Sequence, residues 1–302
     1  MSRSQLHTLG LVLAFATVCL IWGSTFMAIR IGVQELPPAL MAGLRFLAAA
    51  AVLWIIARAL GQKPAGATDW ITASVMGLLL VAAGNGLVTW AEQWVPSNQA
   101  ALLITTGAMW ITLFGTLGPH GHRITLRIAV GLGVGFSGVV LLMAPQGDVE
   151  TQFLWAQIVI LLSSVGWAIG TTYRRNVSVT TPPLMFAAMQ MLLGGALLTV
   201  IGTLAGEWRE WQWNLTGMLS LGYLTIFGSC IAYAFYVWLI EKTTPARLAA
   251  TAYIVPTIAT IMGWVFLDEV LEGLQLLGVF VVILGVILVT APVRRRHPGH
   301  RE

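Results

Sequence analysis

The sequence predicts an all-α, polytopic membrane protein, and two observations lead to this class. The chain of 302 residues is 57% hydrophobic and only 9% charged, with a mean hydropathy of +0.83. Soluble domains carry about 25% charged residues, so this chain could not cover a surface in water. The second observation is an internal repeat: a shift of 145 residues aligns Trp22 with Trp167 and Arg30 with Arg175. We therefore expect two copies of one membrane-embedded unit.

Ten stretches are long and apolar enough to cross a bilayer, whose roughly 30 Å hydrocarbon core takes about 20 residues of helix. Prolines punctuate the connections between them, as expected near helix ends. The first stretch is matched by the sixth and is too long for a signal peptide, so it counts as a true span. The predicted spans are 8–30, 38–60, 69–91, 96–117, 125–144, 152–173, 182–205, 214–240, 245–266 and 271–291.

The charges predict which side of the membrane each loop faces, because cytoplasmic loops are enriched in Lys and Arg. Nine of the 12 acidic residues fall on one side, among them Glu35, Glu92 and Glu269. Of the 16 basic residues, 13 fall on the other side, which both termini share: Arg3, Arg58, Lys63, Arg123, Arg127, Arg174, Arg175, Lys242, Arg247, Arg294, Arg295, Arg296 and Arg301. Both termini are therefore predicted to be cytoplasmic, in agreement with an even number of spans.

The number of spans also predicts the relative orientation of the two repeats. The two units are residues 1–148 and 149–302, and each contains five spans, an odd number. The second copy must therefore lie upside down relative to the first. Inverted repeats of this kind are typical of secondary transporters, which bind their substrate between the repeats near the bilayer midplane. The alternative is a duplicated helical scaffold with no transport role.

Aromatic and uncharged polar residues inside the spans are candidates to line a binding cavity. Tryptophans often anchor helices at the lipid interface, but Trp22, Trp110 and Trp167 lie too deep in their spans for that. The polar residues have an alternative role as interhelical hydrogen-bonding groups, worth about 0.6 kcal/mol each. The candidate substrate-binding residues are Trp22, Ser24, Thr25, Asn85, Trp90, Thr106, Trp110, Trp167, Gln190, Ser229, Tyr233 and Tyr253.

Arg45 is the one ionisable residue that the pattern places plainly inside a span. A charge within the membrane is a candidate functional residue, with a role in gating or in binding charge. The alternative is that its long side chain reaches the outer interface and stays solvated there.

Several familiar kinds of site are absent from the sequence. No Asp, Glu or His is predicted deep in a span, so the carboxylate relay common in pumps is not expected. No Gly-rich loop ending in Lys-Ser/Thr, zinc-protease motif or metal-binding cysteine pattern occurs, and the dinucleotide-like string at 133–138 lies in an apolar span without a strand, so we expect no cofactor, no metal and no enzymatic activity. The basic residues mark topology and do not indicate a nucleic-acid partner. Gly131, Gly135 and Gly138 predict a small-residue face for close helix packing, within the chain or in a dimer.

Taken together, the chain resembles the drug/metabolite transporter superfamily, and within it the EamA-like ten-helix exporters. One departure concerns Gly107–Trp110, where related chains often have a proline, and it leads us to expect a missing kink in the fourth span. The resemblance rests on Trp22–Phe26, Leu44–Phe46, Val95–Pro96, Ala100–Leu103, Thr243–Arg247, Pro256, Glu269 and the pair Gly278 and Gly285.

The resemblance implies a secondary exporter of amino acids or similar small metabolites, working by alternating access in the bacterial inner membrane. The many tryptophans favour aromatic or other apolar amino acids, as in the aromatic amino-acid exporters of this group. One alternative is a broad-specificity exporter of drugs or cationic compounds. Another, of a different class, is a passive channel or a structural membrane scaffold. The expected partners are a small-molecule substrate and the lipid bilayer, with the protein a monomer or a homodimer.

Overall fold

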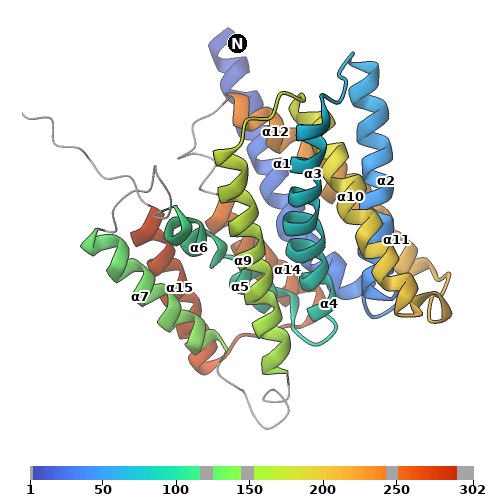
Figure 1. Cartoon of the computed structure of the whole chain (residues 1–302). Helices are drawn as coiled ribbons and strands as arrows, with labels where there is room; N and C mark the ends of the chain where they lie inside the picture. Colours follow the sequence, from blue (N-terminus) through green and yellow to red (C-terminus); the bar gives the residue numbers. More distant parts are fainter. Residues whose placement is uncertain (1–2, 116–124, 144–152, 243–250, 291–302) are drawn as a thin grey trace, which may run out of the picture.

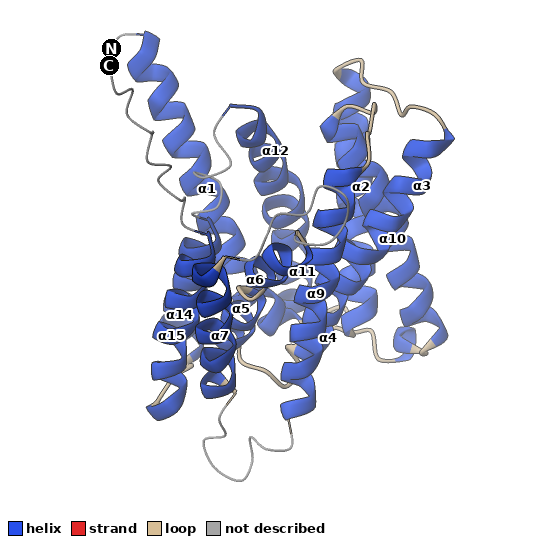
Figure 2. Cartoon of the chain, turned by 60° about the vertical axis from the view of Figure 1, so that its left-hand side comes forward, coloured by secondary structure: helices blue, strands red, loops and turns tan. Residues whose placement is uncertain are grey.

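The computed structural model describes residues 3–115, 125–143, 153–242 and 251–290, and every regular element in these ranges is a helix (Figures 1 and 2). In chain order the elements are α1 (Arg3–Gly32), α2 (Pro38–Ala59), α3 (Ala67–Met76), η1 (Gly77–Gly86), α4 (Leu87–Ala91), α5 (Ser97–Ile104), α6 (Gly107–Phe114), α7 (Leu126–Leu142), α9 (Leu154–Asn176), α10 (Pro183–Leu204), η2 (Glu207–Arg209), α11 (Leu215–Tyr223), η3 (Leu224–Ile231), α12 (Ala232–Lys242), α14 (Thr251–Leu267) and α15 (Gly273–Thr290).

The helices confirm a multi-pass membrane protein. Helical backbone satisfies its own hydrogen bonds, which the bilayer interior requires. The described part also contains three shorter apolar helices, 126–142, 254–267 and 273–288. The number of spans and the side on which the termini lie stay predictions. The helices long and apolar enough to cross a membrane are Thr8–Gly32, Pro38–Ala59, Ala67–Ala91, Leu154–Asn176, Pro183–Leu204 and Leu215–Tyr236.

The fourth predicted span contains a break, so the expectation of a missing kink is wrong. Helix α5 ends at Ile104 and α6 begins at Gly107, with Thr105 and Thr106 between them. The backbone amides of both threonines bond to carbonyls three residues back instead of four. Their hydroxyls bond to carbonyls of α5, and such side-chain bonds compete with regular helix geometry. Two threonines thus interrupt the helix where no proline is present.

Corresponding helices of the two halves begin and end alike. Pro38 and Pro183 occupy the first turns of α2 and α10, where a missing amide proton costs nothing. Just beyond the ends of the same helices, Gly61 and Gly206 adopt left-handed conformations with φ of 76° and 82°. Each pair is separated by 145 residues, so the repeat extends to the backbone conformation.

Each half also binds the exposed amides of a helix start in the other half. The carboxylate of Glu207 accepts hydrogen bonds from the Ala39 and Leu40 amides at 3.2 and 2.7 Å. The carboxamide oxygen of Gln62 accepts one from the Met185 amide at 3.2 Å. Leu40 and Met185, and likewise Gln62 and Glu207, are 145 residues apart. A helix start needs such partners, and a capping bond is worth about 1 kcal/mol.

Both halves contain a π-helical segment in the third helix of the unit. Segment η1 lies between α3 and α4, and η3 lies between α11 and α12. Gly77, at the start of η1, aligns with Gly222 just before η3. π-Helical turns are rare and frequently mark functional sites. Because the two segments occupy matching positions, the residues around them are candidates for a functional site.

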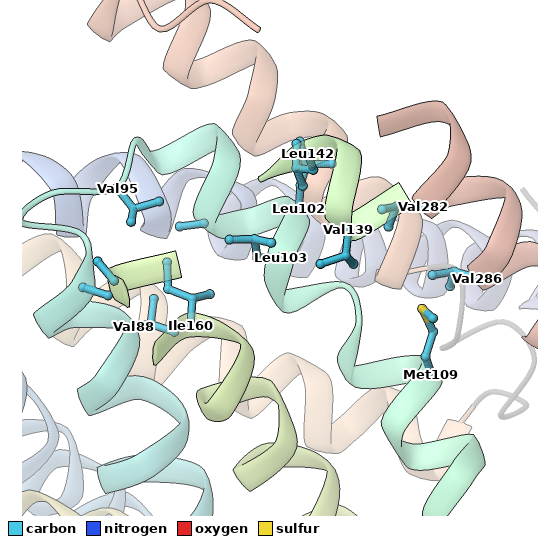
Figure 3. Close-up of a cluster of buried hydrophobic side chains, with 13 residues drawn as sticks. Val88, Val95, Leu102, Leu103, Met109, Val139, Leu142, Ile160, Val282 and Val286 are labelled. Atoms are coloured by element: carbon cyan, nitrogen blue, oxygen red, sulfur yellow. The ribbon is translucent and has the colours of Figure 1, made fainter. Parts of the chain in front are cut away.

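Helices α7 and α15 lie side by side (Figure 1). The pair α7 and α15 and the pair α2 and α10 have the most extensive helix contacts of the described part. A Cβ at Gly278 would lie 2.5 Å from the Leu142 amide nitrogen, so only glycine allows this approach. The small-residue face predicted at Gly131, Gly135 and Gly138 thus packs within the chain. Beside it, a hydrophobic core joins α4–α7, α9 and α15, drawn in Figure 3.

Replacing Gly278 by alanine should destabilise the protein by about 1–3 kcal/mol, because the new methyl overlaps the α7 backbone. Gly133→Ala is the matched control, since a Cβ at Gly133 has nothing within 4 Å. Thermal unfolding in detergent measures both variants. Equal midpoints for Gly278→Ala and Gly133→Ala would show that α7 and α15 do not pack as described.

Candidate functional site

A buried polar cluster lies where α1, α2 and η3 meet, and Arg45 is its charged member. Arg45 is only 5% exposed, although it carries a permanent charge. Its Nε donates to the Ser229 hydroxyl at 2.8 Å, and its guanidinium carbon lies 4.6 Å from the Phe46 ring centre. Its Nη1 is buried without a hydrogen-bond partner. The side chain is therefore held within the protein and keeps one donor free for a ligand.

The first helix reaches the same cluster through Trp22, Ser24 and Thr25. The Trp22 indole Nε1 donates to the Gly228 carbonyl oxygen of η3 at 3.3 Å. A Cβ at Gly228 would lie 3.0 Å from the Thr25 methyl carbon and 3.2 Å from Arg45 Nη2. The hydroxyls of Ser24 and Tyr223 are 2.5 Å apart. The π-helical segment thus brings its backbone directly against α1 and α2.

Gln190 and Tyr233 extend the cluster toward α10 and α12. The Gln190 amide nitrogen hydrogen-bonds with the Tyr233 hydroxyl, and its carbonyl oxygen is buried without a partner. One turn along α12, the Tyr236 ring lies 4.8 Å from that of Trp22. Six of the predicted substrate-binding residues, together with Arg45, therefore belong to one region formed by α1, α2, α10, η3 and α12: Trp22, Ser24, Thr25, Gln190, Ser229 and Tyr233, with Tyr223 and Tyr236 added by the structure.

A second group surrounds the other π-helical segment. A Cβ at Gly84 in η1 would lie 3.0 Å from the Trp167 ring of α9, and the Ser163 hydroxyl donates to the Gly84 carbonyl. The Asn85 side chain donates to the Leu80 carbonyl five residues back, within the same π-helical segment. Trp167 of α9 thus meets η1 as Trp22 of α1 meets η3. Each tryptophan contacts the π-helical segment of the other half.

The remaining candidates have other surroundings. The Thr106 hydroxyl lies 2.9 Å from that of Ser164, between the broken fourth span and α9. The Trp90 ring, 38% exposed, packs with Trp94 and Trp155 in an aromatic group at the end of α4. The Trp110 ring packs on Phe114 and on Phe136 of α7. The side chain of Tyr253 lies outside the described residues, as does the motif Thr243–Arg247.

Besides Tyr223 and Tyr236, sequence reasoning missed Glu92. The hydropathy pattern placed it in a loop, just beyond the third span, yet its side chain is completely buried. The Arg30 guanidinium donates to its backbone carbonyl, which ties α1 to the end of α4. The burial of Glu92 could have been predicted only from its proximity to the basic residues Arg30 and Arg45, and no spacing in the chain indicates that proximity.

Two further features bear on what this region can hold. Among the described residues, no group of three or more His, Cys, Asp or Glu side chains is arranged to bind a metal ion. An apolar hollow of about 540 Å³ lies beside the cluster, between α1 and α12, lined by Gly10, Ala14, Ile231, Ala234, Phe235 and Trp238. It offers a solute apolar contact but no polar group for orientation.

Among the described residues, an apolar helical bundle encloses buried hydrogen-bonding groups and the buried cation Arg45, and such intramembrane polar groups are typical of membrane transporters. The family comparison agrees, since the EamA-like transporter family matches residues 8–144 and again 154–291. The chain belongs to the EamA-like transporter family, within the drug/metabolite transporter superfamily, and is a multi-pass protein of the plasma membrane.

Individual relatives are similar over almost the whole chain. The "Uncharacterized inner membrane transporter YedA" of Escherichia coli (strain K12) is 36% identical over 92% of this chain and 89% of its own length. The "Probable amino-acid metabolite efflux pump" of the same organism is 25% identical over 90% and 91%. A crystal structure covering 93% of this chain and 97% of its own superposes with a TM-score of 0.63 at 21% identity, which supports the fold.

Substituting Ser229 by alanine should lower the free energy of unfolding by about 1.5–3 kcal/mol, because it leaves the buried Arg45 Nε–H without an acceptor. Ser74→Ala is the control: Ser74 is exposed, and its hydroxyl bonds only within its own helix. Thermal unfolding in detergent compares the two. A Ser229→Ala midpoint equal to that of Ser74→Ala would contradict the Arg45–Ser229 bond.

Proposed function

We propose that the protein is a secondary transporter that exports amino acids, preferring aromatic or other apolar ones, by alternating access between its halves. In this proposal residues 1–148 and 149–302 form two inverted five-helix units, and ten spans place both termini in the cytoplasm. The unit boundary agrees with the two regions matched by the family, 8–144 and 154–291. The substrate site lies between the units.

The observation that carries the proposal is the crossed contact of two tryptophans. Trp22 bonds to Gly228 in η3, and Trp167 packs on Gly84 in η1. Both contacts join one half to the irregular helix of the other. When two such halves rock against each other, both contacts must change. The surroundings of a solute bound between the two tryptophans would then change with them. Transporters bind substrates at irregular helix segments of this kind, at the repeat interface.

The chemistry of the region suits a zwitterion with an apolar side chain. The free Nη1 of Arg45 is a charged donor, and Arg pairs well with carboxylates. The unpartnered carbonyl oxygen of Gln190 is an acceptor suited to an ammonium group. Indole rings such as Trp22 and Trp167 offer aromatic contact worth about 0.5–1.5 kcal/mol beyond the buried area. The relative named an amino-acid metabolite efflux pump adds support at 25% identity.

Counterflow in proteoliposomes tests the proposal. Vesicles loaded with unlabelled phenylalanine should accumulate labelled phenylalanine transiently above equilibrium, because an alternating-access carrier exchanges one for the other. Protein-free vesicles give the background. Counterflow of an apolar organic cation without counterflow of any amino acid would replace the proposal by the drug-exporter alternative, and flux without counterflow would indicate a channel.

Alanine in place of Trp22 or Trp167 should raise the KM for exchange roughly fivefold, the equivalent of about 1 kcal/mol of lost aromatic contact. Trp213→Ala is the matched control, since the Trp213 side chain is 80% exposed. Exchange rates at varied substrate concentration separate KM from maximal rate. If both the Trp22→Ala and the Trp167→Ala variants match Trp213→Ala, the substrate does not bind between the two tryptophans.

A further inference from the structure

Glu92 differs from buried Asp69 and from half-buried Glu269, two other carboxylates of the described residues. Asp69, 4% exposed, accepts hydrogen bonds from the amides and hydroxyls of Thr180 and Thr181. Glu269 accepts them from Ser97 and Asn98 at the start of α5. Both carboxylates therefore have a structural role, Asp69 accepting through its Oδ2 and Glu269 through both of its oxygens. Glu92 is 0% exposed, and neither of its carboxylate oxygens has a hydrogen-bond partner.

The charged groups that interact electrostatically with Glu92 come from three parts of the chain. Arg30 of α1 and Arg45 of α2 are the cations, and Glu269, which precedes α15, is the anion. Arg30 already donates to the Glu92 backbone carbonyl. Arg45 has an unpartnered Nη1 in the same interior. A buried carboxylate and a buried guanidinium thus interact through space, with no hydrogen bond between them.

An ionised carboxylate without hydrogen bonds is expensive to bury, and such a group takes up a proton instead. Glu92 lies one residue beyond the third span, Ala67–Ala91. Burial raises the pKa of its carboxyl well above the usual range, and the Glu269 carboxylate raises it further, whereas Arg30 and Arg45 act in the opposite direction. These surroundings therefore favour the neutral form of the Glu92 carboxyl.

We propose that Glu92 is the proton-binding site of the transporter and that Arg45 stabilises its carboxylate when the proton leaves. The site exchanges its proton with water on one side of the membrane at a time. Arg45 stays protonated throughout, so the charge of the pair changes by the one proton that Glu92 gains or loses. This inference rests on the proposed exporter function, because it assigns the group through which a proton gradient would drive export.

A pH gradient across proteoliposomes tests the assignment. In the wild type, a gradient should stimulate phenylalanine transport several-fold over exchange at equal pH. In Glu92→Gln, which keeps the shape but cannot ionise, the ratio of gradient-driven transport to exchange should fall to its value without a gradient. Glu92→Asp should restore part of the stimulation. Glu210→Gln is the control, because Glu210 is an exposed carboxylate.

A second measurement needs no substrate and so remains informative if phenylalanine is not transported. A carboxyl whose pKa is raised on folding stabilises the folded state at low pH, and that contribution is lost as the pH rises through the folded pKa. The wild-type thermal midpoint should therefore fall as the pH rises above about 4.3, the ordinary Glu value. The fall should be smaller in Glu92→Gln but undiminished in Glu210→Gln.

The two measurements separate the two proposals. No wild-type counterflow, with a pH dependence of the midpoint that Glu92→Gln reduces and Glu210→Gln does not, would reject phenylalanine export and keep Glu92 as a proton site. Gradient-driven transport that survives in Glu92→Gln would overturn the assignment. The same conclusion follows if the midpoints of Glu92→Gln and Glu210→Gln depend on pH equally.

Discussion

The bilayer interior offers no hydrogen-bond partners, so the backbone that crosses it must find its partners inside the chain. The rest of the structure follows from this constraint. Helical segments satisfy their own backbone, and the exposed amides at helix starts are bound by side chains of the opposite half, as Glu207 and Gln62 show. The side chains of each half thus satisfy amides of the other half, and these hydrogen bonds help to hold the two halves together.

The same constraint makes the few unsatisfied groups informative. Arg45 Nη1, the Gln190 carbonyl oxygen and the Glu92 carboxylate are among the buried polar groups without partners, whereas Asp69 Oδ2 and both Glu269 oxygens accept hydrogen bonds. Leaving such groups unpaired costs free energy that packing elsewhere has to offset. Groups of this kind are suited to bind what arrives from outside, a substrate or a proton. In the proposed alternating-access mechanism, the two halves would move against each other near the irregular helices η1 and η3.

Much of the fold could be predicted because hydropathy and proline spacing act locally. The multi-pass class, the helix starts at Pro38 and Pro183 and the close packing of Gly138 all follow from patterns along the chain. The break at Thr105 and Thr106 could not, because it depends on how two hydroxyls compete for carbonyls of α5. The π-helical segments were equally invisible, since they carry apolar sequence indistinguishable from that of a regular helix.

The sequence by itself determined the class of protein, its family resemblance and the residue types of a candidate site, because composition and repeat are properties of the chain alone. Only the tertiary structure decided which of those residues meet. It joined Arg45 to Ser229 across 184 positions of the chain and placed Trp110 against α7. It also buried Glu92, which hydropathy had left in a loop. Burial depends on which helices pack around a residue, and no local pattern contains that information.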